Sequence, residues 1–110
     1  MKNIYIGLII SLFSTTNYAQ VADIEWQRSI GGSSSEEAKA IQQTTDGGYI
    51  VAGYSLSNDG DVSGNHGDRD FWIVKLDMSG NISWQNSLGG SSYDEANSIQ
   101  QTTDGGYIVA

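Results

Sequence analysis

The loop between Asn58 and Asp70 holds the densest group of side chains that could do chemistry. Oxygen-bearing side chains recur there at alternate positions, and Gly64 permits a sharp turn. Alternate oxygens of this kind suit a hard cation, although no helices flank the loop and its match to the helix-flanked calcium loop is imperfect. We therefore predict a calcium site, with a plain solvated loop as the alternative. The predicted ligands are Asp59, Asp61, Ser63, Asn65 and Asp70.

Residues for catalysis are few. The chain has no Cys, and its single His, His66, has no second His or Cys nearby, which disfavours metal or acid–base chemistry through it. No nucleophile-elbow, P-loop or dinucleotide-binding glycine pattern occurs. Glycoside hydrolysis needs two carboxylates across a cleft. We predict no catalytic or cofactor-binding residue in this segment; the nominees for such a pair would be Glu36, Glu37, Asp94 and Glu95.

An internal repeat with an offset of 58 residues organises the chain. Residues 24–52 match residues 82–110 at 22 of 29 positions, and Ile41–Ala52 returns unchanged as Ile99–Ala110. Tandem units of this size bury their faces against their neighbours. We predict a first repeat at 24–81 and a partial second repeat at 82–110. We also expect a longer protein, because further repeats are needed to close the fold.

Strand signals fill each unit. Short runs with a period of two, or with unbroken apolar character, are separated by turns rich in Gly and Asp. A helix over Ser33–Gln43 is a weaker alternative, because only Ala38 and Ile41 would form its apolar face. The predicted strands are Ile24–Ile30, Ala38–Thr44, Tyr49–Tyr54 and Phe71–Leu76.

These units predict an all-β fold. Antiparallel strands that are apolar on both faces indicate four-stranded sheets stacked face to face, as in the blades of a β-propeller. One and a half such units of 58 residues are present. The alternative is another β-repeat or a solenoid, although solenoid coils usually have shorter repeats.

The repeat motifs resemble those of a known group of proteins. W-Q-x-S-[IL]-G-G, E-A-x-x-I-Q-Q-T-x-D-G-G-Y-I-V-A-G and D-F-W-I-V-K-L-D-x-x-G-N-I-x-W-Q are similar to tandem repeats of large secreted bacterial proteins that are read as β-propellers. The resemblance covers Ile24–Ala110 and implies association with type IX secretion; some such proteins are labelled endoglucanase by similarity. The spacing of Asp77, Gly80 and Trp84 also resembles quinoprotein-type propellers, which implies that Trp26 and Trp84 pack between blades.

Residues 1–19 have the features of a secretory signal peptide. Lys2 precedes the apolar run Ile4–Phe13, and small polar residues lead to a predicted cleavage after Ala19. The run is shorter than the roughly 20 residues that cross a bilayer as a helix. We predict a secreted or cell-surface protein with no membrane span after cleavage, and a linker at 20–23.

Recurrence separates structural from functional positions. A turn or packing residue is needed in every unit, so we expect Asp46 and Asp104 to hold turns, and Glu37 and Glu95 to bond the backbone of the Gly-Gly-Ser-Ser loops. Positions that differ between the copies are predicted to face solvent. Examples are Glu25 and Ser83, Arg28 and Asn86, and Lys39 and Asn97.

Charge narrows the range of partners. The formal net charge of −8 repels phosphate backbones, so nucleic acid is not an expected partner. We predict a secreted scaffold or binding module for glycans or surface proteins. The alternative is part of an extracellular carbohydrate-active enzyme, similar to a glycoside hydrolase, whose catalytic region lies beyond Ala110.

Overall fold

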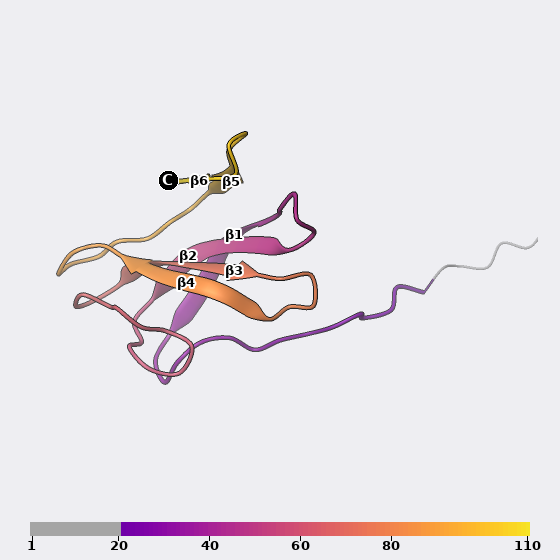
Figure 1. The fold of residues 1–110 in the computed structure, drawn as a ribbon. Coiled ribbons are helices and arrows are strands. Elements are labelled where there is room, and N and C mark those ends of the chain that lie inside the picture. The colour runs from indigo at the N-terminus through magenta and orange to yellow at the C-terminus, as the bar shows by residue number, and fades with distance from the viewer. Residues whose placement is uncertain (1–20) are drawn as a thin grey trace, which may run out of the picture.

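The computed structural model describes residues 21–110, which are all-β and contain no helix. A four-stranded antiparallel sheet has the order β1-β2-β3-β4, and a separate two-stranded sheet pairs β5 with β6 (Figure 1). The all-β prediction is therefore confirmed, and the helical alternative over Ser33–Gln43 is wrong. The strands are β1 (Glu36–Gln43), β2 (Tyr49–Ser55), β3 (Asp70–Leu76), β4 (Ile82–Leu88), β5 (Ile99–Gln101) and β6 (Tyr107–Val109).

The predicted signal peptide, with its cleavage after Ala19, lies outside the described residues. Within residues 21–110, the structure contains no helix with the length and apolar character needed to cross a membrane.

Local chemistry closes the β1–β2 hairpin. The N–H of Thr44 donates to the carbonyl of Gly48, and Gly47 adopts the left-handed conformation with φ 86°. The Asp46 carboxylate accepts hydrogen bonds from the Thr44 hydroxyl and from the N–H of Gly48. Asp104 makes the same two contacts in the second copy, so the prediction that both aspartates hold turns is confirmed.

The outer strand of the sheet comes from the second copy of the repeat. Ile82–Leu88 pairs antiparallel with β3, as its alternating pattern predicts. The matching segment Ile24–Ile30 forms no strand, so that prediction is wrong for the first copy. A strand needs a backbone partner as well as an apolar pattern, and no backbone hydrogen bond links this segment to the rest of residues 21–110.

One face of the sheet, here called the front face, carries the main hydrophobic cluster. Trp72, Val74 and Leu76 of β3 form this cluster together with Val62 from the β2–β3 loop. Five half-buried apolar side chains pack against it, including two from the N-terminal segment that crosses this face. They are Trp26, Ile30, Tyr49, Val51 and Ile82.

The opposite face, here called the back face, carries the intervening residues of β2 and β3. Ile50 and Ala52 are fully buried, and Ile73 is nearly so. The C-terminal segment with β5 and β6 lies on this side, next to β1 and β2 (Figure 1). Both faces of the sheet are therefore covered by chain, which explains why β2 is a nearly unbroken apolar run.

Candidate functional site

Two loops at one end of the sheet are tied together through backbone N–H groups. Consecutive N–H groups from Gly31 to Ser34 point at oxygen acceptors, most of which come from the β2–β3 loop. The N–H of Gly31 donates to Asp61 Oδ2 over 3.1 Å, and the N–H of Ser33 donates to Asp59 Oδ1 over 2.8 Å. The N–H of Ser34 donates to the Ser57 hydroxyl. The aspartates therefore accept backbone hydrogen bonds that would otherwise need water.

The alternate spacing of Asp59 and Asp61 has a structural explanation in these contacts. Their alternate spacing predicted that both side chains point in the same direction. Both do, and they point toward the Gly31–Ser34 loop. The hydrogen bonds from Ser33 lower the pKa of Asp59, against a smaller opposing effect of burial. A carboxylate held in this way is ionised and oriented by the protein itself.

The other predicted calcium ligands are engaged elsewhere. The Ser63 hydroxyl accepts a bond from the Gln85 amide of β4, and the Asn65 amide donates to the carbonyls of Ser55 and Asp68. Asp70 is fully buried, and its Oδ2 lies 2.7 Å from His66 Nδ1 and also accepts the N–H of His66. The structure thus gives the five residues different protein partners.

Within residues 21–110, no group of three or more His, Cys, Asp or Glu side chains converges in a way that would hold a metal ion. Backbone carbonyls and hydroxyls also bind calcium, so the calcium site stays a prediction.

The four carboxylates proposed for hydrolysis each have a partner within the protein. Glu36 Oε2 accepts the N–H of Gly32, and Asp94 Oδ2 accepts the N–H of Gly90 at the matching place in the second copy. The prediction that Glu37 and Glu95 make these bonds is therefore wrong by one residue. Those two side chains contact Lys39 instead, and Glu95 also binds Arg69.

The pKa of Glu36 is that of a structural carboxylate. Partial burial raises the pKa of Glu36, but hydrogen bonds from Ser57, Gly32 and Ser55 together lower it below its ordinary value. A general acid needs a raised pKa near neutral pH. Glu36 is therefore suited to holding its loop and not to proton donation.

Arg69 joins the two copies of the repeat, which the sequence did not reveal. Its guanidinium lies 3.9 Å from the ring centroid of Tyr54 and 4.7 Å from that of Tyr93, and it donates to Glu95 over 2.7 Å. Tyr54 belongs to the first copy, whereas Tyr93 and Glu95 belong to the second. A single basic residue within an acidic loop was the available signal, because such a residue often has an anionic or aromatic partner.

Two aromatic contacts recur at the repeat period. Trp26 meets Tyr49 with ring centroids 5.7 Å apart and an interplanar angle of 64°. Trp84 meets Tyr107, 58 positions later in each case, at 5.9 Å and 60°. The predicted packing role is confirmed for Trp26, which also packs against the front-face cluster, whereas Trp84 contacts Tyr107 and is 38% exposed. Packing of these residues between blades stays a prediction.

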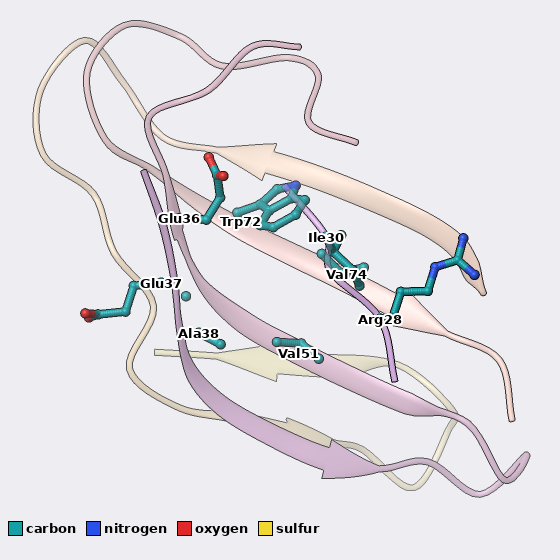
Figure 2. A pocket seen from close by; sticks show the side chains of 9 residues that line it. Arg28, Ile30, Glu36, Glu37, Ala38, Val51, Trp72 and Val74 are labelled. Carbon is teal, nitrogen blue, oxygen red and sulfur yellow. The ribbon is translucent and has the colours of Figure 1, made fainter. Parts of the chain in front are cut away.

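A cavity of about 230 Å³ opens on the front face between the N-terminal segment and β1 and β2 (Figure 2). Ile30, Val51, Trp72 and Val74 give it an apolar floor, and Arg28 and Glu36 bring charge to its rim. The three pairs of differing positions that were predicted to face solvent are exposed, so Arg28 faces solvent at this rim.

Comparison with protein-family models, with curated proteins and with solved structures finds no match to this chain. The contacts above therefore carry the functional argument.

Proposed function

We propose that this protein is an exported β-repeat scaffold whose 58-residue units stack face to face as blades of the β-propeller type. The single observation that carries this proposal is the pair of contacts Trp26–Tyr49 and Trp84–Tyr107. The same residue types meet at the repeat period with almost the same distance and angle. Trp84 belongs to the first sheet and Tyr107 to the second, so this repeated contact is of the kind that stacks one sheet on the next.

Loops at the rim of the stack would form the binding surface for glycans or surface proteins. The Gly31–Ser34 loop and the β2–β3 loop brace each other through the acceptors Asp59, Asp61 and Ser57. Rigid loops on a sheet scaffold suit recognition, because little ordering entropy remains to be lost on binding. Their acidic, polar character suits neutral sugar hydroxyls or basic groups of a protein partner.

Double-mutant cycles test the stacking. Trp84→Ala, Tyr107→Ala and the double variant are unfolded in urea, and the Trp26 and Tyr49 variants serve as the matched cycle. We expect a coupling of about 0.5–1.5 kcal/mol for each pair, typical of aromatic contacts. Coupling at Trp26–Tyr49 without coupling at Trp84–Tyr107 would contradict stacking of like units.

Retention on soluble glucans in affinity electrophoresis tests the binding. Asp59→Ala removes the acceptor of the Ser33 N–H and should weaken retention, whereas the exposed Glu25→Ala should not. Retention that is absent for the wild-type chain removes glycans as the ligand. Release of reducing ends would favour the enzyme alternative.

A further inference from the structure

The segment Ile24–Ile30 is the counterpart of β4 and has no strand partner within residues 21–110. In β4, Gln85 lies opposite Val74 and Asn86 lies opposite Ile73 of β3. The N-terminal segment has the same alternating pattern, yet none of its backbone groups bonds to backbone elsewhere in residues 21–110. Unpaired extended backbone of this kind is a ready template for another strand.

The polar residues shared by the two copies are those with which β4 contacts its sheet. Trp72 Nε1 donates to Gln85 Oε1 over 2.8 Å, and the Ser87 hydroxyl donates to the carbonyl of Ser63 over 2.9 Å. Gln27 and Ser29 occupy the matching positions but are exposed in the N-terminal segment. The side chains of Gln27 and Ser29 therefore lie on a side of the segment that contacts no other strand within residues 21–110.

The opposite side of the segment packs against the front face of the first sheet. Trp26 packs on Tyr49 in the geometry with which Trp84 packs on Tyr107. Trp84 belongs to the last strand of the first sheet, and Tyr107 belongs to the second sheet. Trp26 therefore occupies the place of a last strand that faces the first sheet. Only the sheet behind it is lacking within residues 21–110.

The burial of Ala96 and Ala38, which occupy the same position in the two copies, also indicates that a neighbouring sheet is absent from residues 21–110 beside the first copy. Ala96 is 0% exposed, and its N–H donates to the carbonyl of Gly53 where the second copy meets the first sheet. Its counterpart Ala38 is exposed and lines the cavity beside Ile30 and Val51 (Figure 2). The same residue is therefore covered at the junction that is present and open at the cavity.

We propose that Ile24–Ile30 is the fourth strand of a sheet whose third strand is a β3-type strand, of the D-F-W-I-V-K-L kind, from another repeat unit of this protein. The pairing is antiparallel, in the register of β3 with β4. Gln27 lies opposite the residue equivalent to Val74, and Arg28 lies opposite the residue equivalent to Ile73. This inference names the strand that pairs with Ile24–Ile30, and it rests on the proposed repeat scaffold.

Cross-linking to a synthetic third strand tests the register, because the chain contains no Cys. The full chain carries either Gln27→Cys or Arg28→Cys. The peptide spans residues 69–81, carries cysteine at the position of either Val74 or Ile73, and has two lysines added for solubility. We expect a disulfide for Gln27 with Val74 and for Arg28 with Ile73. The crossed pairings should lose it, because neighbouring side chains of a strand point to opposite faces.

Gln85→Cys and Asn86→Cys are the matched controls. These positions are equivalent in sequence, but β3 already pairs with β4, so we expect little cross-linking to the peptide. Equal yields from matched and crossed pairings, or yields at Gln27 and Arg28 no higher than at the controls, would overturn the proposal. The Trp84–Tyr107 coupling is measured without peptide, so failure of the scaffold itself is seen separately.

Discussion

The identical sequences Ile41–Ala52 and Ile99–Ala110 form the same hairpin in the same register but differ in burial. Ile41–Gln43 pairs with Tyr49–Val51 in the first hairpin, and Ile99–Gln101 pairs with Tyr107–Val109 in the second. Ile50 is 0% exposed, whereas its counterpart Ile108 is 61% exposed. The turns nevertheless agree, with φ 86° at Gly47 and 89° at Gly105. Turn geometry and hairpin register are thus local, whereas burial depends on the neighbouring strands.

The two hairpins differ in whether a third strand pairs with them. β2 pairs with β3 from Tyr49 to Ser55, and chain covers both faces of that sheet. Within residues 21–110, β6 pairs only with β5. A two-stranded hairpin without further strands or a packed face leaves its apolar side chains open to water, which accounts for the exposure of Ile108.

Truncation of the buried isoleucine should have the largest effect. We expect Ile50→Ala to destabilise the chain by about 2–5 kcal/mol, because it removes apolar atoms from a packed site and leaves a cavity. The matched variant Ile108→Ala should cost about 0.5 kcal/mol or less, as at other exposed positions. Urea unfolding followed by circular dichroism measures both. Equal losses would show that the second hairpin is as well covered as the first.

Enlarging the matched alanines should have the next largest effect. Ala96→Leu is expected to cost about 1–3 kcal/mol, because it overpacks a fully buried position. Ala38→Leu should be tolerated, because Ala38 lines an open cavity. Thermal melts of the two variants distinguish these outcomes. A larger loss at Ala38 would mean that its cavity is closed in solution.

The matched turn aspartates should differ in their response to acid. The Thr44 hydroxyl, Lys75 and the N–H of Gly48 lower the pKa of Asp46, whereas the pKa of Asp104 is lowered by the Thr102 hydroxyl and the N–H of Gly106. A carboxylate with a lowered folded-state pKa contributes stability above its ordinary pKa of 3.8, and this contribution disappears as the pH falls through the folded-state value.

We therefore expect the melting midpoint to fall as the medium is acidified below about pH 4. Asp46→Asn should remove more of this dependence than Asp104→Asn, because Asp46 also pairs with the buried Lys75. Asp46→Asn should also lower the midpoint at pH 7, where it leaves Lys75 without its anion. Identical pH profiles for the two variants would contradict a role for Lys75.

Calcium should have the smallest effect, confined to the loop between β2 and β3 that follows the first hairpin. The calcium hypothesis predicts a rise in the melting midpoint with about 1 mM calcium, the range of weak extracellular sites, and its reversal by chelator. Asp59→Asn should abolish the rise. An unchanged midpoint would leave the loop held by its backbone hydrogen bonds alone.

Several features of the fold could be predicted from the sequence because they have local causes. Alternation and glycine-rich turns predicted β1 to β4, and recurrence predicted the turn role of Asp46. The carboxylate that braces the Gly-Gly-Ser-Ser loop was assigned one residue too late, to Glu37 in place of Glu36. Recurrence in the two copies shows that a segment has a structural role. The directions of the Glu36 and Glu37 side chains depend in addition on the bulge between Ala38 and Ala40.

The candidate site was harder to predict because its contacts join distant segments. Arg69 lies between Tyr54 and Tyr93, and the buried Asp70 contacts His66. Neither arrangement follows from spacing within one loop, since each depends on how β2, β3 and the second copy pack.

The sequence alone determined the repeat, the turn geometry and the positions able to form strands, because these depend on residues near one another in the chain. Tertiary structure alone decided which of these strands found partners. Ile82–Leu88 became β4 because the edge of β3 was available, whereas its copy Ile24–Ile30 had only the front face to pack against. Backbone hydrogen bonds between strands are non-local, so identical patterns diverge where the neighbouring strand differs.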